Sequence, residues 1–447
     1  MSPVTSPTIP VYHGHWLFKS AFQIQKNPVH FFEEKSKTLG DTFYAAYPGG
    51  KVLISANPGL IKQVLQTNHK NYPKDRGYEQ LALMLGQGLV TSKGAMWKKQ
   101  RKIAQPTFHK KNLENLFISM TEIANQYIKE LAQKKGEVID ITQEMMAVTA
   151  RIAMKALFSS DIEGNLKEIY HAISYAQEFV AKRAINPMII PWTRVNGSLR
   201  KFNRHRDVMN GLINNLIETR QQESSSKADF LQMLLEARYE DTGESMPLDL
   251  LRDELVTIFS AGHETSANGL AWTMYLLSQH PEVVQKLKDE VQQVLGDRVP
   301  SFTDLKQMPY TRQVIEEGMR LYPPVWGVGR YAREADQWQD HHIAANTIVI
   351  CQIFSLHRHP DLWEAPEEFN PDRFETEKAK ARPSTHYLPF GAGPRMCIGN
   401  HFAMMEMQLL LPLLIRNFSF DLVQNHQVTL EPMITLRPKN GILMTLN

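Results

Sequence analysis

Cysteine is scarce in this sequence, and long apolar runs are absent. Cys351 and Cys397 are the only cysteines among the 447 residues, too few to build the disulfide framework of a secreted protein. No stretch reaches about 18 uninterrupted apolar residues, and residues 1–10 have neither the basic nor the apolar region of a signal peptide. We therefore expect a cytoplasmic protein without a membrane-spanning helix.

The chain also lacks a large excess of charge of either sign. Lysine and arginine number 50 against 47 aspartates and glutamates, which gives a formal net charge of +3. This excess of positive charge is too small to indicate a nucleic-acid partner. The 43% hydrophobic and 22% charged content is that of an ordinary globular protein. We find no linker and no internal repeat, so one domain over residues 1–447 is expected.

Apolar residues recur at three- and four-residue spacing through much of the chain, which predicts helices. Shorter alternating runs bounded by glycine, proline and asparagine predict strands. The predicted helices are residues 112–158, 203–219, 250–280, 281–295, 308–321 and 400–415, and one more capped by Asn57 and beginning at Pro58. The predicted strands are a hairpin of residues 41–47 and 51–55, a strand in 347–354, and a final hairpin of 428–436 with 442–446. The fold class is therefore mainly α with small β-sheets.

The most informative segment reads FGAGPRMCIG, from Phe390 to Gly399. Its three glycines let the backbone bend tightly and approach a flat ligand closely. Because a predicted helix follows at once, Cys397 lies near free N–H groups and the positive end of a helix dipole, which favour a thiolate. A thiolate on haem iron promotes O–O cleavage, and Arg395 is placed to bind a haem propionate. The alternative is that Cys397 is a small buried hydrophobic residue in a glycine-rich turn.

The longest predicted helix contains Ala261-Gly262-His263-Glu264-Thr265 near its middle. Gly262 costs about 1 kcal/mol relative to alanine inside a helix, and small residues leave room for a ligand. An acid beside an alcohol is the pairing needed to deliver protons to bound dioxygen. Glu264 and Thr265 are therefore candidate catalytic residues, and a kinked core helix with a solvated glutamate is the alternative.

Two further groups pair charged residues with a helix face. Glu317 and Arg320 lie three residues apart, and Arg373 supplies a second guanidinium that is able to share the carboxylate in a buried network. Trp97 and Arg101 lie four residues apart, so an indole N–H and a cation are available beside one another for an anion. Taken alone, both patterns are more typical of solvated surfaces.

In their order and spacing, these segments resemble the cytochrome P450 family, from about Leu17 to the C-terminus. The resemblance implies a triangular, mainly helical prism with small β-sheets. It implies haem b with Cys397 as the iron ligand, and Glu264 with Thr265 as the residues of oxygen activation. Glu317, Arg320 and Arg373 match the structural triad. The residues that match haem contacts are Lys74, Trp97, Arg101, Ala261, Arg330, Phe390, Arg395, Cys397 and Gly399.

The same resemblance implies a haem-thiolate monooxygenase that inserts one atom of O2 into a lipophilic substrate, such as a fatty acid, a terpenoid or a carotenoid. We expect no membrane anchor before these motifs and no fused flavin or ferredoxin module after them. We therefore expect electrons from a separate ferredoxin or flavodoxin with its reductase, docking at Lys98, Lys99 and Lys102. The pocket residues implied by the resemblance are Phe259, Val325, Trp326, Met433 and Ile434.

Other functions remain as alternatives. A peroxide-driven haem-thiolate enzyme would share the cysteine loop, but the family's peroxygenases replace the acid–alcohol pair that is intact here. A haem-binding sensor or carrier would need no such pair. A cysteine hydrolase would need a histidine placed to activate Cys397. His357 and His359 lack further metal ligands at a recognisable spacing.

Overall fold

The structure, a computed structural model, describes residues 9–13, 23–24, 26–47, 50–160, 166–223, 227 and 229–447. Helices form most of it. They are α2 (Pro28–Leu39), α3 (Pro58–Lys62), α4 (Gly77–Leu85), α5 (Gly94–Ala104), α6 (Lys110–Ala132), α7 (Ile141–Phe158), α8 (Leu166–Ile185), α9 (Ile190–Val195), α10 (Ser198–Gln222), α11 (Phe230–Glu236), α12 (Leu248–Leu277), α13 (Pro281–Val294), α14 (Pro309–Leu321), α15 (Ile353–Leu356), α16 (Thr376–Ala381) and α17 (Asn400–Asn417).

The strands form small sheets. One has five strands in the order β1 (Val11–Tyr12), β2 (Thr42–Tyr47), β3 (Gly50–Ser55), β8 (Ile348–Gln352) and β5 (Gly327–Tyr331). Another contains β4 (Val138–Asp140), β12 (Leu443–Leu446) and β9 (Phe420–Leu422). The pairs are β6 (Asp336–Trp338) with β7 (His341–Ile343), and β10 (Leu430–Pro432) with β11 (Leu436–Pro438). The mainly α class with small sheets is therefore confirmed.

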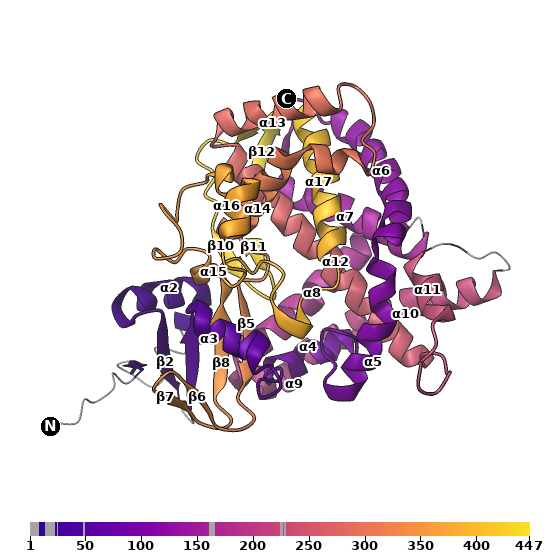
Figure 1. Cartoon of the computed structure of the whole chain (residues 1–447). Helices are drawn as coiled ribbons and strands as arrows, with labels where there is room; N and C mark the ends of the chain where they lie inside the picture. The colour runs from indigo at the N-terminus through magenta and orange to yellow at the C-terminus, as the bar shows by residue number, and fades with distance from the viewer. Residues whose placement is uncertain are drawn as a thin grey trace.

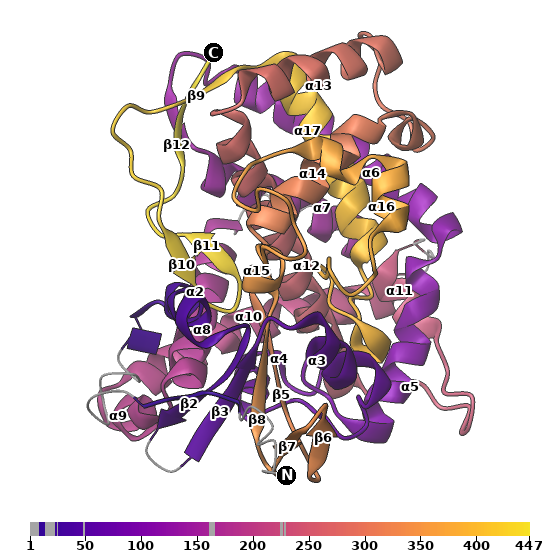
Figure 2. The same ribbon diagram turned by 60° about the vertical axis from the view of Figure 1, so that its left-hand side comes forward.

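The sheets and the helices occupy different parts of the molecule. Figures 1 and 2 show the five-stranded sheet at one end, beside α2 and α3, with the long helices filling the rest. The largest apolar core lies among α6, α7, α12 and α17, and α12 packs most extensively against α7. Because α12 runs through this core, most of its 30 residues are buried.

Local signals explain where several elements begin. The side chain of Asn57 accepts hydrogen bonds from the amides of Gly59 and Leu60, so the predicted cap of α3 is confirmed. Asp140 caps α7 in the same way by accepting from the Thr142 amide at 3.0 Å. This second cap separates α6 from α7, so the expected helix over residues 112–158 is two helices with β4 between them.

The predicted pairing of residues 428–436 with residues 442–446 in a final hairpin is wrong. Residues 430–432 pair with 436–438, which makes a tighter hairpin than expected. β12 instead lies between β4 and β9, antiparallel to both. The alternating pattern of β12 identified it as a strand, but the choice among edges depends on which segments the helices bring alongside.

Candidate functional site

The cysteine loop is closed by its own backbone. The amide of Cys397 donates to the carbonyl of Phe390 at 2.9 Å, and the amide of Met396 donates to that of Gly393 at 3.0 Å. Gly393 has φ +68°, and a Cβ there would collide with the Leu65 carbonyl. Glycine is therefore required at this position, which brings the loop against the segment that follows α3.

Cys397 is enclosed by protein yet keeps accessible surface. Burial raises the pKa of its thiol, and the Gly399 amide and Arg101 oppose this shift without reversing it. The Gly399 N–H and Arg101 together therefore lower the pKa of this thiol by less than burial raises it. Stabilising the thiolate requires further positive charge at the sulfur, which a bound metal ion supplies.

A hollow of about 1110 Å³ opens beside Cys397. Its walls come from α5, α14 and α16, and from the first turns of α17. Four cationic side chains line it: Arg101, Lys306, Arg312 and Lys380. Glu316, the only acidic residue in its lining, is paired with Arg312 at 3.1 Å. This side of the cysteine loop is therefore basic.

The middle of α12 borders open space at Ala261 and Gly262. Ala261 is exposed although Ser260 and His263 are buried, and a Cβ at Gly262 would meet no atom within 4 Å. Thr265 is partly exposed, and its hydroxyl donates to the Ala261 carbonyl at 2.8 Å. Open space therefore lies against α12 at the predicted positions.

Glu264 points away from this opening into a buried cluster. Thr435 donates to its Oε1 at 2.5 Å, and Arg437 Nε donates to the same oxygen at 2.6 Å. Gln177 of α8 donates to Oε2 and accepts from Arg437. Adjacent residues of a helix diverge by about 100°, which explains why no hydrogen bond joins Glu264 to Thr265 within the described chain.

The sequence analysis missed Gln177, Thr435 and Arg437. They lie 87, 171 and 173 positions from Glu264. No local spacing relates them to the acid. A buried carboxylate needs a cationic partner, so a cation near Glu264 was to be expected. The sequence did not show that this cation is Arg437.

Another buried acid, Glu406, lies on α17 facing α12. It is 0% exposed, and neither carboxylate oxygen accepts a hydrogen bond from the described residues. Burial raises its pKa to about 8, opposed by the nearby Ser266 hydroxyl. Ser266 follows Thr265 and donates to the Gly262 carbonyl at 3.3 Å. Glu406 is thus a protonated acid close to the opening in α12.

Several of the cations expected to contact haem lie close together beside the cysteine loop. Lys74 is 7% exposed, and its pKa is well below the usual value because of burial and the nearby Arg395 and Arg330. Burial and Arg330 likewise lower the pKa of Arg395 to about 10. The Arg395 guanidinium lies 3.8 Å from the centre of the Trp97 ring. Asp75, whose carboxylate interacts with Arg330, is a single acid against the three cations Lys74, Arg330 and Arg395, so the cluster favours an anionic ligand.

The predicted charge network is present. Glu317 and Arg320 are fully buried and 2.6 Å apart, and Arg373 Nε lies 3.4 Å from the carboxylate. Arg320 also donates to the carbonyls of His357, Pro366 and Glu368. The network therefore attaches α14 to the irregular segment that leads to the cysteine loop.

The predicted pocket residues lie in different surroundings. Phe259 is 2% exposed, and its ring contacts those of Phe158 and His263, so its side chain is part of the core. The Trp326 indole donates to the Met433 carbonyl at 3.0 Å and packs against the five-stranded sheet. Val325, Met433 and Ile434 are partly buried.

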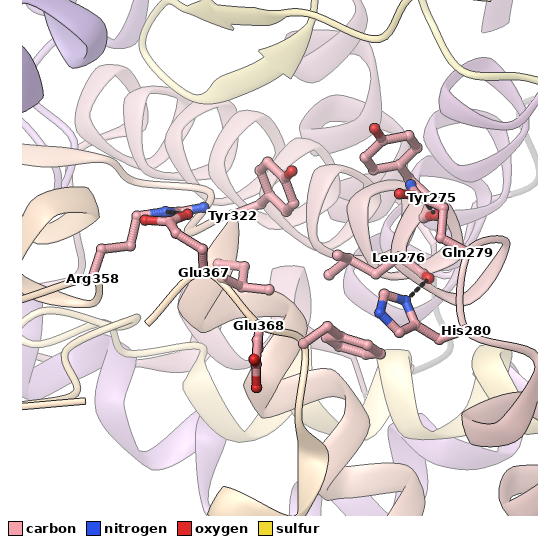
Figure 3. A pocket seen from close by; sticks show the side chains of 10 residues that line it. Tyr275, Leu276, Gln279, His280, Tyr322, Arg358, Glu367 and Glu368 are labelled. Atoms are coloured by element: carbon pink, nitrogen blue, oxygen red, sulfur yellow. Dashed lines mark hydrogen bonds and ion pairs between the residues drawn. The ribbon is translucent and has the colours of Figure 1, made fainter. Parts of the chain in front are cut away.

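A smaller hollow of about 360 Å³ lies at the end of α12 (Figure 3). Arg358 and Glu367 form an ion pair at its edge, 3.1 Å apart, and Tyr275 and His280 face it from α12 and the turn that follows. None of the predicted site residues lines it. His357 is buried elsewhere and its Nε2 accepts from the Leu388 amide, and the described residues contain no group of three potential metal ligands.

Two of the three lysines predicted to dock an electron donor are already paired. Lys99 lies 2.6 Å from Asp241, and Lys102 contacts Glu240. These acids belong to the short turn that follows α11. All four side chains are about half exposed or more, so the pairs are weak and open to competition.

Comparisons with known proteins agree with this geometry. A family model described as Cytochrome P450 matches residues 9–445. The chain is 32% identical to a putative cytochrome P450 132 of Mycobacterium tuberculosis, over 88% of this chain and 87% of that protein. It is 30% identical to cyclooctat-9-en-7-ol 5-monooxygenase of Streptomyces melanosporofaciens, over 83% and 81%. The heme domain of cytochrome P450DA superposes with a TM-score of 0.91 at 24% identity, covering 99% of this chain and 97% of that one. No described helix is long and apolar enough to cross a bilayer.

Proposed function

This chain belongs to the cytochrome P450 family, and from that premise we propose that Cys397 holds the iron of its haem b. Membership makes the protein a haem-thiolate monooxygenase. The proposal concerns which residues hold the haem, move protons and receive the partner. The observation that carries it is the combination of an accessible, enclosed Cys397 with a cluster of three cations, Lys74, Arg330 and Arg395, beside the single acid Asp75.

The described residues fit a haem in three respects. Ala261 is exposed, and a Cβ added at Gly262 would meet no atom within 4 Å, so α12 has open space beside these two residues. Lys74, Arg330 and Arg395 are placed to bind the two propionates, which would relieve their mutual repulsion. Trp97 stacks against Arg395 and keeps it oriented. When bound, the haem supplies the oxygen chemistry, and the chain binds, orients and protonates.

For proton delivery, we propose that Glu264 and Thr265 act in series. Arg437 pairs with Glu264, and Gln177 and Thr435 fix its carboxylate away from the opening. Delivery requires this carboxylate to leave Arg437, take a proton and pass it to the Thr265 hydroxyl. Arg437, whose side chain is 16% exposed, connects the cluster to solvent.

For the substrate, we propose a lipophilic molecule of the fatty acid, terpenoid or carotenoid kind. Val325, Met433 and Ile434 are apolar and partly buried, and their neighbours Pro324 and Thr435 lie against Gly269 and Asn268 of α12. A relative is named as a monooxygenase of cyclooctat-9-en-7-ol. For electrons, we propose a separate ferredoxin or flavodoxin that docks beside Cys397, at the basic hollow and at Lys98, Lys99 and Lys102.

The visible spectrum of the reduced, carbon monoxide-treated protein tests the central proposal. The expected result is a strongly red-shifted Soret band that Cys397→Ser abolishes. Cys351→Ala is the matched control, because this cysteine is fully buried in β8 and should leave the band unchanged. A histidine-type band in the wild-type protein, or a band that survives Cys397→Ser, would reject Cys397 as the ligand.

A further inference from the structure

The hollow at the end of α12 is lined by a buried arginine that has few acceptors. The Arg358 side chain is only 8% exposed, and its Nε donates to Glu367 at 3.1 Å. Nη1 is enclosed without an acceptor, and no acceptor for Nη2 is found among the described residues. Burial lowers the pKa of this guanidinium, and Glu367 opposes the shift. Because buried N–H groups normally have acceptors, Arg358 can still donate to a ligand.

Aromatic rings hold this guanidinium in place. Its central carbon lies 3.7 Å from the centre of the Phe354 ring and 5.5 Å from that of Tyr322. Tyr322 in turn stacks on Trp272, with ring centres 4.2 Å apart. Figure 3 shows Arg358 beside Tyr322 and Glu367 at one side of the hollow. The rings contact the face of the guanidinium, so its edges remain available for hydrogen bonds.

The other side of the hollow supplies rings and acceptors. Tyr275 faces it from α12, and its hydroxyl, like that of Tyr322, forms no hydrogen bond within the described chain. Nδ1 of His280 bonds to the Leu276 carbonyl at 2.7 Å, which leaves Nε2 of the neutral ring as an acceptor. Phe369, whose ring centre lies 5.1 Å from that of His280, adds apolar surface. This side therefore suits an aromatic group.

The wall formed by residues 366–370 is fixed by the buried charge network. Arg320 donates to the Glu368 carbonyl at 2.9 Å, and Glu317 accepts from the Asn370 amide at 2.9 Å. The volume of about 360 Å³ lies within the range of small-molecule sites, about 300–1,000 Å³. The hollow is therefore a preformed site of the right size for a small molecule.

We propose that this hollow binds a small zwitterion of the aromatic amino acid type, whose carboxylate contacts Arg358, whose ammonium contacts Glu367 and whose ring packs on Tyr275. One cation and two acids line the hollow, Glu368 being the second acid, so a ligand with only negative charge is disfavoured. A ligand with only positive charge would leave the guanidinium edges unbonded. A metal ion is a poor occupant, because the described residues contain no group of three potential ligands.

Isothermal titration calorimetry of the haem-loaded protein with L-phenylalanine tests the proposal. A dissociation constant of about 1 mM or tighter is expected for a ligand of this size. Phenylpropionate lacks the ammonium and phenethylamine lacks the carboxylate, so each should bind about tenfold more weakly or worse. L-phenylalanine should still bind when phenylimidazole occupies the haem iron. Binding that phenylimidazole abolishes would place the amino acid in the haem cavity and overturn the proposal.

Glu367→Gln separates the two charged contacts, and the change is mild because this side chain is 67% exposed. L-phenylalanine should bind about tenfold more weakly, whereas phenylpropionate should bind more tightly because a repelling carboxylate is gone. Glu364→Gln is the matched control. It removes the same charge from an exposed residue of the same segment that does not line the hollow, and should change neither affinity.

Arg358→Gln should abolish binding of both L-phenylalanine and phenylpropionate. If this buried change prevents folding, the comparison of Glu367→Gln with Glu364→Gln decides the question. Absence of binding, equal affinity for all three compounds, or an unchanged preference in Glu367→Gln would each overturn the proposal. These readouts do not depend on monooxygenase activity.

Discussion

Arg437 donates from Nε to Oε1 of Glu264 at 2.6 Å, and its Nη2 lies 2.5 Å from the same oxygen. Glu264 is buried and Arg437 is partly exposed, and the pair joins β11 to the middle of α12. The acid proposed for proton delivery is therefore held in an ion pair beside the opening that Thr265 faces.

Replacing Arg437 should change how much product is formed per electron. In Arg437→Gln the Glu264 carboxylate keeps only the neutral donors Gln177 and Thr435, so no ion pair holds it in place. Product formed per electron should fall, because a displaced carboxylate passes protons to Thr265 less efficiently. Arg437→Lys keeps a cation and should restore most of this ratio. An unchanged ratio in Arg437→Gln would mean that Arg437 is only structural.

Removing the Thr265 hydroxyl should separate electron use from product formation. Thr265→Ala is expected to consume reductant at a rate similar to the wild type while releasing peroxide, because the last proton donor is lost. Loss of one general-acid group costs about 10²- to 10⁴-fold in the step it serves. Thr265→Ser keeps a hydroxyl and should stay coupled. Unaltered coupling in Thr265→Ala would exclude this role.

Lys74 should stabilise bound haem while destabilising the haem-free chain. Its buried ammonium lies among Arg330 and Arg395, so Lys74→Met should raise the melting temperature of the haem-free protein. The same change removes a propionate partner, so haem transfer to apomyoglobin should become faster. Lys93→Met, an exposed lysine near the same cluster, is the control. If Lys74→Met stabilises both the haem-free protein and the retention of haem, or destabilises both, Lys74 does not act through the propionates.

Glu406 should make the folded state less stable as pH rises. The folded protein raises its pKa from 4.5 to about 8, so the unfolded chain releases this proton first. The contribution of Glu406 is then fully present below about pH 4.5 and is lost progressively up to about pH 8. Relative to Glu406→Gln, wild-type stability should fall by up to about 1.4 kcal/mol per pH unit in that window. Urea unfolding measures this, with the exposed Glu218→Gln as the control, and parallel curves would contradict it.

The paired lysines make the docking proposal testable in both directions. Lys98→Glu with Lys99→Glu and Lys102→Glu should slow reduction by an acidic ferredoxin or flavodoxin. Glu240→Gln with Asp241→Asn frees Lys99 and Lys102 and should accelerate it. Both effects should shrink with added salt. Stopped-flow reduction measures them, and rates that ignore the triple reversal would place docking elsewhere.

Much of the site was readable because its signals are local. The glycines of the cysteine loop, the spacing of Glu317 and Arg320, and the Asn57 cap depend on chain geometry within a few residues. Their predicted arrangements are present. The cation cluster was also anticipated, although through resemblance to a family, since Lys74 and Arg395 are distant in sequence.

The sequence by itself determined the fold class and the positions of the cysteine loop and of α12, because helical period, capping and glycine turns act over short distances. Tertiary structure alone decided that Glu264 pairs with Arg437 and that Glu406 lies next to Ser266. It also decided that β12 pairs with β4 and β9. In each case the partner is selected by which surfaces the packed helices bring together. That selection depends on burial and shape over the whole core, which no local pattern records.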